Sequence, residues 1–421
     1  MTFQIVRDPV LGEEVWLATT PNGLPLRILP RPKFRETAAV ITFQYGSTDL
    51  DFEIGGKRIT DPSGTAHYLE HKLFEDEELA VFQRFAARGA SVNAQTGFSR
   101  TSYFFQATSQ VRDNLIDLLR LVSKPHITQE NVDKERGIIA QEVRMYEDSA
   151  DYCTTFDLLG CLFPSHPVRF TVGGTVDSIA AITPETLLQS WSLFYRTGNA
   201  ALAVAGPVEP QEIYDLACAC ALPSGAPPAR LLSHDRGPIG AARRERKMVV
   251  ARPKVLIGVK DHTSGSDWQA RTERAVRTNV VLDSMFATSS PLREAMHQRG
   301  EVDDSIGAGF MGDRTFAVTT LGCESENPAA AELSLRRALA QHVEYTDEHI
   351  ERLRRRHLGG FVRGCESVRS LAFAHSAEQL DGAPPFHTLA ILRDLTLASV
   401  AARSAEMLSE DRLAVAVTER A

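Results

Sequence analysis

The sequence is poor in long apolar runs and in clustered cysteines, and it has no excess of positive charge, with 46 basic and 54 acidic residues. No window approaches about 18 uninterrupted apolar residues, which argues against a membrane-spanning helix. Six cysteines are scattered over 421 residues, so we expect no disulfide scaffold and a reducing compartment. The formal net charge of −8 argues against nucleic-acid binding. The N-terminal stretch MTFQIVRDPVLGEEVW lacks a basic start followed by an apolar core. We therefore predict no secretory signal, no membrane partner and a cytoplasmic location.

The length of the chain and a stretch rich in Pro and Gly predict two domains. Hydrophobic residues make up 43% and charged residues 24% of the sequence, which is ordinary for a globular protein. At roughly 100–200 residues per domain, two or more domains are expected. Residues 223–246, PSGAPPARLLSHDRGPIGAARRER, are rich in Pro, Gly, Ala and Arg and show little periodicity. We predict an N-terminal domain at 1–222, an interdomain linker at 223–246 and a C-terminal domain at 247–421.

The second half of the chain repeats the order of elements in the first half. VFQRFAARGASVNAQTGFSRTSYFFQAT compares with LREAMHQRGEVDDSIGAGFMGDRTFAVTT, since each reads as a helix ending at Arg-Gly and two strands. An amphipathic helix follows each segment, and then a Thr-capped helix, TQENVDKERGIIAQE or TDEHIERLRRRHLGG. The pattern predicts duplication of one α+β unit. The alternative is that two unrelated α+β domains share short helix–strand patterns.

The stretch GTAHYLEHKLFE carries the residues that point to chemistry. Its helix is expected to start near 61–63, which offers N-cap candidates. His67 and His71 are four residues apart, so on a helix both can present imidazole nitrogens to one ion. Glu70 lies near the position that a metal-bound water would take. Zinc hydrolysis needs three protein ligands, an open position and a base, so one ligand is missing. The alternative is a polar helix face with a Glu–His pair.

A later predicted helix, KERGIIAQEVRMYE, offers the missing ligand. Glu135 and Glu142 are about two turns apart, so both carboxylates share one face. One of them could complete the coordination, and the other could orient a histidine through its second nitrogen. In the second half, Leu353 and Gly360 stand at the matching positions, and NVVLD at 279–283 matches the histidine motif. The histidines and glutamates therefore occur in the first half of the chain only. This asymmetry favours a chemical role for them over a structural role shared by both halves.

These residues resemble a known family. H-x-x-E-H is the inverted zinc motif of the inverzincins. Here it is accompanied by GASVNAQTGFSRTSYFF, KERGIIAQEVRMYED, HPVRFTVGGTVDSI and FYRTGNAALAVAGPV. Together they resemble the pitrilysin/insulinase (M16-type) zinc metallopeptidases, and more closely the short bacterial members related to mitochondrial processing peptidase. The resemblance covers nearly the whole chain, most clearly residues 20–210.

The resemblance implies a fold and a set of roles. The fold would be two homologous α+β domains, each a mostly antiparallel sheet packed against helices, forming half of a clam-shell dimer around a closed chamber. The implied roles are zinc ligation by His67, His71 and Glu142, water activation by Glu70, support by Glu135, and substrate-strand pairing by Asn93 and Ala94. The last role suits an edge strand, whose free N–H and C=O groups can pair with an extended peptide.

One departure from the family pattern concerns the second domain. Active members usually carry an Arg and a Tyr in a motif like LR-x-x-x-G-L-x-Y, and these residues help to bind the substrate carbonyl. The matching stretch, SPLREAMHQRGEVDDS, places His297 at the Arg position and Asp303 at the Tyr position, with Arg293 one turn early. We therefore expect a heterodimer, in which a homologous subunit supplies the Arg/Tyr pair.

The predicted function is zinc-dependent endopeptidase activity on unfolded peptides inside the chamber, with the water activated by Glu70. The alternative is a non-catalytic scaffold or a peptide-binding subunit of the same fold. Relatives of the scaffold kind lack an intact motif, whereas His67, Glu70, His71 and Glu142 are all present. A purely structural zinc site would normally use four protein ligands, and no fourth ligand is evident near the motif.

Overall fold

Two compact units make up the protein. The computed structural model describes residues 3–75, 81–231, 237–261, 265, 267–341, 343–407 and 410–421. The first unit comprises Met1–Val143, Thr171–Leu232 and Val362–Phe386, and the second comprises Arg144–Phe170, Ser233–Phe361 and His387–Ala421. Each unit therefore combines stretches that lie far apart in the sequence.

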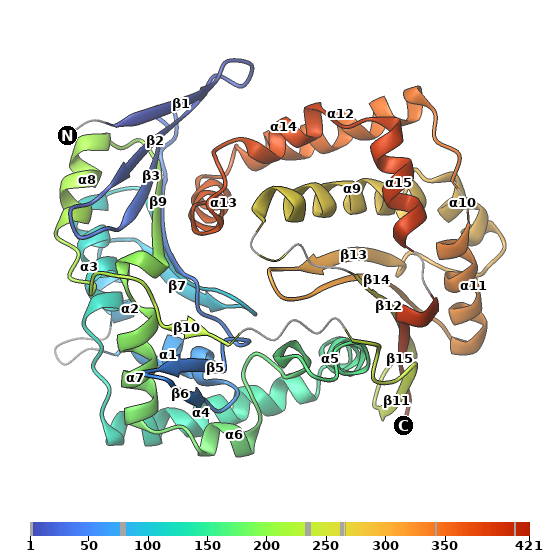
Figure 1. The fold of residues 1–421 in the computed structure, drawn as a ribbon, viewed down its shortest axis with the longest axis horizontal. Helices are drawn as coiled ribbons and strands as arrows, with labels where there is room; N and C mark the ends of the chain where they lie inside the picture. The colour runs from blue at the N-terminus through green and yellow to red at the C-terminus, as the bar shows by residue number, and fades with distance from the viewer. Residues whose placement is uncertain are drawn as a thin grey trace. The chain divides into compact units, whose positions relative to one another are not determined.

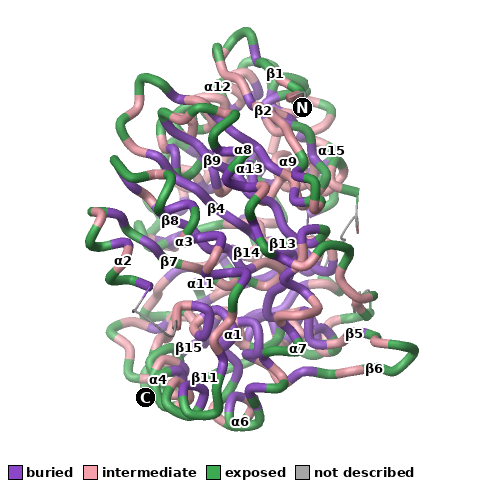
Figure 2. Tube along the Cα trace, turned by 90° about the vertical axis from the view of Figure 1, so that its left-hand side faces the viewer, coloured by how far each residue is buried: buried purple, intermediate pink, exposed green. Residues whose placement is uncertain are grey.

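A seven-stranded sheet forms the centre of the first unit, in the order β1-β2-β3-β9-β4-β8-β7. β3 and β9 are parallel, whereas the other neighbours are antiparallel. β4 and β9, TAAVITF and AALAVAG, are buried throughout, as Figure 2 shows in purple. Such apolar strands suit the middle of a sheet with both faces covered. The strands are β1 Gln4–Asp8, β2 Glu13–Thr19, β3 Pro25–Pro30, β4 Thr37–Phe43, β7 Ser91–Thr96, β8 Thr101–Ala107 and β9 Ala200–Gly206.

Helices cover both faces of this sheet. Successive residues of β4 belong to different clusters, because side chains alternate across a strand. Ala39 and Ile41 pack with the helices of the N-terminal half, whereas Ala38 and Val40 pack against α13. The helices of the first unit are α1 Thr65–Leu73, α2 Val81–Ala87, α3 Val111–Ser123, α4 Gln129–Glu147, α6 Val176–Ala180, α7 Pro184–Phe194, α8 Pro210–Cys218 and α13 Val368–Asp381.

The second unit contains a five-stranded sheet in the order β11-β15-β12-β14-β13. Its strands are β11 Arg243–Met248, β12 Lys254–Lys260, β13 Gly307–Gly312, β14 Ala317–Glu324 and β15 Leu413–Arg420. Its helices are α5 Ala150–Leu162, α9 Trp268–Phe286, α10 Pro291–Gln298, α11 Pro328–Ala340, α12 Asp347–Gly364, α14 His387–Arg393 and α15 Leu397–Met407.

The two sheets share one arrangement of strands. In the first unit, β3-β9-β4-β8-β7 begins with a parallel pair and continues antiparallel. In the second unit, β11-β15-β12-β14-β13 does the same. The equivalent strands also come at equivalent points of the two halves of the chain. The predicted α+β fold with two similar, mostly antiparallel sheets packed against helices is therefore confirmed.

Each half of the sequence contributes one helix to the sheet of the other half. α5 follows α4 in sequence but packs on β12 and β15, and α13 packs on β4 and β9 (Figure 1). Gly258 on β12 allows the close approach of α5, because a Cβ there would lie 2.7 Å from Leu162 Cδ1 and 2.8 Å from Leu158 Cδ2. By packing, α5 therefore belongs to the second unit and α13 to the first, although α5 lies in the first half of the sequence and α13 in the second.

The predicted linker, 223–246, contains regular structure where it is described. Ala229–Arg230 forms β10, which pairs with β5 (Asp51–Ile54) in a small sheet with β6 (Lys57–Thr60). The linker also includes the start of β11, and residues 232–236 lie outside the described part of the chain. Within the described residues, no helix has the length and apolar character that crossing a bilayer requires. All six cysteines are free thiols.

Candidate metal centre

The helix that carries the motif begins at a glycine. α1 starts at Thr65, and its N-cap is Gly64, with a φ of 93° and no side-chain cap. The expected cap among residues 61–63 is therefore wrong. Gly64 is favoured because a Cβ at this position would lie 2.5 Å from the carbonyl oxygen of Gly173, and because positive φ suits glycine. The close approach of the 173–174 backbone thus sets where α1 starts.

His67, His71 and Glu142 come together in the first unit. The two imidazole rings lie on one face of α1, with ring centroids 4.7 Å apart. Glu142 of α4 lies 3.7 Å from His67 Nε2 through Oε1 and 3.4 Å from His71 Nε2 through Oε2. One ligand atom from each residue falls within 4.8 Å of the others. A tetrahedral zinc ion with ligands at about 2.0–2.1 Å separates its donors by roughly 3.3 Å, so the donor set fits such an ion after small adjustments.

Glu135 contacts the opposite side of one histidine. Its Oε1 lies 3.0 Å from His71 Nδ1, so a proton on Nδ1 leaves the Nε2 lone pair facing the cluster. The geometry thereby separates the two glutamates, because Glu142 joins the histidine cluster and Glu135 orients His71. His67 is held differently, since its buried Nδ1 has no hydrogen-bond partner among the described residues.

The two histidines have opposite pKa shifts. Burial, followed by repulsion from His71, lowers the pKa of His67 to about 4. Burial also acts to lower the pKa of His71, but hydrogen bonds with Glu135 and Glu142 outweigh it and raise this pKa to about 9. The hydrogen bond with His71 in turn lowers the pKa of Glu135. Without an ion, the cluster therefore holds one neutral and one protonated imidazole near neutral pH.

Glu70 contacts the end of β7 and interacts electrostatically with His71 and Glu142. Its side chain is nearly buried, and Thr96 Oγ1 donates a hydrogen bond of 2.5 Å to Glu70 Oε2. Burial raises the pKa of Glu70, although the Thr96 hydrogen bond and the His71 charge act to lower it. A carboxylate with a raised pKa beside a metal-binding cluster is the kind of group that serves as a general base.

Two side chains of α1 fasten this helix to α4. Tyr68 donates from its hydroxyl to the carbonyl of Val132 at 2.5 Å, and Lys72 Nζ donates to the carbonyl of Asn131 at 2.9 Å. Lys72 is fully buried and also forms an ion pair with Glu75. These bonds fix the distance between the histidines on α1 and the glutamates on α4. Sequence reasoning missed them, because spacing within a helix carries no signal for a side chain that bonds to another helix's backbone.

Asn93 and Ala94 lie on β7, at the edge of the seven-stranded sheet. In the described structure β7 pairs only with β8, where Asn93 is opposite Phe104 and Ala94 is opposite Tyr103. Both residues thus belong to an edge strand, whereas their pairing with a substrate stays a prediction. The same strand ends at Thr96, the partner of Glu70.

His297 and Asp303, the residues that the sequence aligns with an Arg/Tyr pair, stand in solvent or have local partners. His297 lies exposed in the last turn of α10. Asp303 forms an ion pair of 2.5 Å with Arg252 and accepts a hydrogen bond from the Ser305 amide. Hydrogen bonds from Ser305 and Arg252 lower the pKa of Asp303 to about 2. Asp303 is therefore an anion held by neighbours, unlike the tyrosine of the family pattern.

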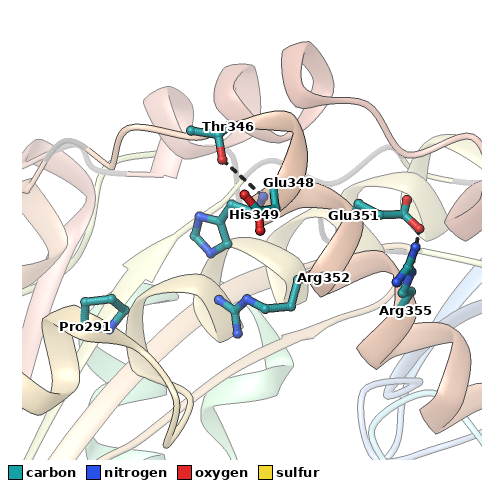
Figure 3. A pocket seen from close by; sticks show the side chains of 7 residues that line it. All are labelled: Pro291, Thr346, Glu348, His349, Glu351, Arg352 and Arg355. Atoms are coloured by element: carbon teal, nitrogen blue, oxygen red, sulfur yellow. Dashed lines mark hydrogen bonds and ion pairs between the residues drawn. The ribbon is translucent and has the colours of Figure 1, made fainter.

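The second unit holds no equivalent of the cluster in its described residues. It does contain a separate cavity of about 570 Å³ beside the start of α12, lined by Pro291, Thr346, Glu348, His349, Glu351, Arg352 and Arg355 (Figure 3). Both of its arginines have local partners, since Arg355 Nε donates to Glu351 at 2.8 Å and Arg352 donates to Ser289 at 3.3 Å. None of the predicted site residues lines this cavity.

Comparisons with known proteins agree on one family. A profile of the insulinase family (peptidase family M16) matches residues 54–161. YmfH of Bacillus subtilis, described as an uncharacterised zinc protease, is 32% identical over 415 residues, covering 96% of both chains. The mitochondrial-processing peptidase subunit beta of Caenorhabditis elegans is 25% identical over 220 residues, covering 51% of this chain and 46% of that one. A crystal structure of an M16-like peptidase from Alicyclobacillus acidocaldarius shares 32% identity and a TM-score of 0.92, covering 99% of this chain and 100% of that one.

Proposed function

Because the chain belongs to the insulinase family, peptidase family M16, we propose that it is the metal-bearing subunit of a zinc-dependent endopeptidase acting on unfolded peptides. The observation that carries this proposal is the convergence of His67, His71 and Glu142 within 4.8 Å. Three protein ligands with a fourth position open are the arrangement of a catalytic zinc site, whereas a structural site fills all four positions.

The ligands and their supports have distinct tasks. His67 and His71 would bind zinc through Nε2, and Glu142 through its carboxylate. Glu135 would hold the His71 ring, because its carboxylate accepts the Nδ1 proton at 3.0 Å. When bound, zinc supplies a Lewis acid that polarises the scissile carbonyl and lowers the pKa of the attacking water.

Glu70 would act as the general base and then as the general acid. Its carboxylate takes a proton from the attacking water and later delivers it to the leaving amine. Burial favours the protonated form that must exist between these steps, since it raises the pKa of Glu70. The substrate backbone would align along β7, where Asn93 and Ala94 offer the edge of the sheet.

Three substitutions separate the metal ligands from the base. We expect Glu70→Gln to keep zinc but to lower peptide cleavage by about a hundredfold or more, because only the proton acceptor is lost. His67→Ala and Glu142→Ala should instead lose zinc. Elemental analysis measures the metal, and a fluorogenic unstructured peptide, tested with and without chelator, measures cleavage in the presence of candidate partner subunits.

Glu348→Gln is the matched control, because Glu348 lies in the second unit and lines the separate cavity. It should leave both metal content and cleavage unchanged. Normal turnover by Glu70→Gln would exclude Glu70 as the base. Full zinc content in both ligand variants would exclude the proposed metal centre.

The missing Arg/Tyr pair supports a two-chain enzyme. We propose that a homologous subunit supplies these residues and that the two chains enclose a chamber, which admits unfolded peptides by size. A relative is named as a subunit of mitochondrial-processing peptidase, and in this chain His297 and Asp303 occupy the corresponding positions.

A further inference from the structure

Thr96 stands at the junction between the edge strand and the proposed base. It is the last residue of β7 and is paired with Thr101 of β8. Its hydroxyl lies 2.5 Å from Glu70 Oε2. Glu70 is 9% exposed and Thr101 is fully buried, whereas Thr96 itself is half-buried. The contact is therefore short enough to restrain both side chains.

The direction of this hydrogen bond follows from the donors available. An ionised carboxylate can only accept, so the Thr96 hydroxyl must donate to Glu70. Thr101 offers a competing acceptor at 3.4 Å, which is a much weaker contact than the one to Glu70. The Thr101 hydroxyl proton is itself directed to the carbonyl of Tyr45 at 2.8 Å. Thr96 therefore has one strong acceptor, the carboxylate of the proposed base.

The two side chains differ in stiffness. Glutamate has three rotatable bonds and loses considerable rotamer freedom when it is held in one geometry. Threonine is β-branched, and its χ1 is restricted by the strand backbone. A bond between the two therefore transfers the rigidity of β7 to the carboxylate of Glu70. The Thr96 hydroxyl engages Oε2, and the Thr96 backbone also hydrogen-bonds to this carboxylate.

We propose that Thr96 is a positioning residue, which holds the Glu70 carboxylate where it can take the proton of the attacking water and which links the base to the strand that aligns the substrate. This inference rests on the proposed peptidase function. Because β7 carries Asn93, Ala94 and Thr96, one rigid strand would set the positions of both the peptide backbone and the base.

A pair of threonine substitutions tests the role. Thr96→Val keeps the shape and β-branching of the side chain but removes the hydroxyl, and Thr96→Ser keeps the hydroxyl. With the partner subunit present, we expect Thr96→Val to lower kcat about tenfold or more, since a hydrogen bond to a charged group is lost, with KM changed less than about twofold. Thr96→Ser should keep kcat within about threefold of the parent. Thr60→Val, which removes an exposed strand hydroxyl of the same unit, is the control.

Two measurements without turnover exclude a merely structural effect. Zinc content by elemental analysis should be equal in the parent and in Thr96→Val. In a Glu70→Gln background, which cannot cleave, the dissociation constant of an unstructured peptide should be the same with and without the Thr96→Val substitution. A weakened peptide affinity or lost zinc would assign Thr96 to strand structure and overturn the positioning role.

The outcomes also distinguish this inference from the function on which it rests. An active parent with an equally active Thr96→Val variant would overturn the role of Thr96 alone. Equal losses in Thr96→Ser and Thr96→Val would do the same, because the hydroxyl would then not be the cause. A parent that cleaves no peptide with any homologous partner would overturn the peptidase function, and the role of Thr96 with it.

Discussion

At the scale of single residues, each histidine of the candidate centre is prepared differently for an ion. His67 has a pKa of about 4 because it is buried beside another imidazole, so its nitrogen is already free to ligate. His71 has a pKa of about 9, because the hydrogen bonds of Glu135 and Glu142 outweigh its burial. Ligation must therefore displace a proton from the His71 site, and binding of metal is linked to pH.

Glu135→Gln tests the second carboxylate. The amide keeps the size of the side chain but loses the charge that holds the His71 ring, so we expect zinc affinity to weaken by about 10- to 100-fold. Competition with a chelator of known affinity measures the change. Glu130→Gln, an exposed glutamate in the first turn of the same helix, is the control and should bind zinc normally. Equal affinity in the two variants would contradict the orienting role.

Asp61 lies four residues before α1. Its environment predicts that the free energy of unfolding depends on pH. Asp61 is buried and accepts a hydrogen bond of 2.7 Å from Ser190 on α7. Burial raises its pKa from 3.8 to about 6. The folded state thus binds a proton more tightly than the unfolded state, and the contribution of Asp61 to the free energy of unfolding falls as pH rises from about 4 to about 6.

Asp61→Asn should remove this cost, because asparagine can still accept the Ser190 hydrogen bond but carries no charge. We expect the variant to be more stable than the parent by about 2–3 kcal/mol at pH 7.5, and to match the parent near pH 4. Urea unfolding at both pH values measures the difference. The exposed Asp148 provides the control as Asp148→Asn. A gain that is the same at both pH values would contradict the buried-charge explanation.

At the scale of elements, the buried side chain of Arg27 holds α13 to the sheet of the first unit. Arg27 of β3 donates to Gln379 at 2.6 Å, to Glu378 at 3.1 Å and to the carbonyl of Ala383. Its side chain is 3% exposed. The apolar face of α13 buries hydrophobic surface against the sheet. The directional bonds of Arg27 specify the position of the helix on β3. A buried arginine is favourable here because each of its nitrogens has a partner.

Arg27→Met should therefore loosen α13. It removes a guanidinium that is almost fully buried and takes its counter-charge from the partly buried Glu378 carboxylate, so we expect the free energy of unfolding to fall by about 3–5 kcal/mol. Arg100→Met is a matched control, because Arg100 pairs with Asp381 of the same helix but its own side chain is 30% exposed, against 3% for Arg27. The control should lose less than about 1 kcal/mol. Similar losses in the two variants, measured by urea unfolding, would contradict the anchoring role of Arg27.

At the scale of the whole molecule, the proposal that a partner subunit supplies the Arg/Tyr pair predicts how activity depends on assembly. We expect the purified chain to bind zinc but to cleave an unstructured peptide at least about a hundredfold more slowly alone than with a homologue that carries the Arg/Tyr pair, because the carbonyl oxygen lacks its donors. Size-exclusion chromatography with light scattering identifies the complex in each assay. Adding the homologue to the Glu70→Gln variant is the control and should restore nothing. Full activity of a homodimer would contradict the proposal.

The sequence by itself determined what depends on local periodicity. The turn of an α-helix brings His67 and His71 to one face of α1, and the repeated order of helices and strands predicts two similar α+β units. Both follow from spacing along the chain, so they could be predicted before any packing was known. The resemblance to a family added roles, and the convergence of Glu142 with the two histidines agrees with it.

Only the tertiary structure decided what depends on distances between elements. It gave Glu142 and Glu135 their different contacts, brought Thr96 to Glu70, and placed α5 and α13 on the sheets of the opposite sequence halves. Glu135 and Glu142 share one face of α4, so spacing alone could not distinguish them. The distinction arises from the bonds of Tyr68 and Lys72 to α4 and from the sheet packing around them, because contacts between distant segments are set by the whole fold rather than by the pattern of any one segment.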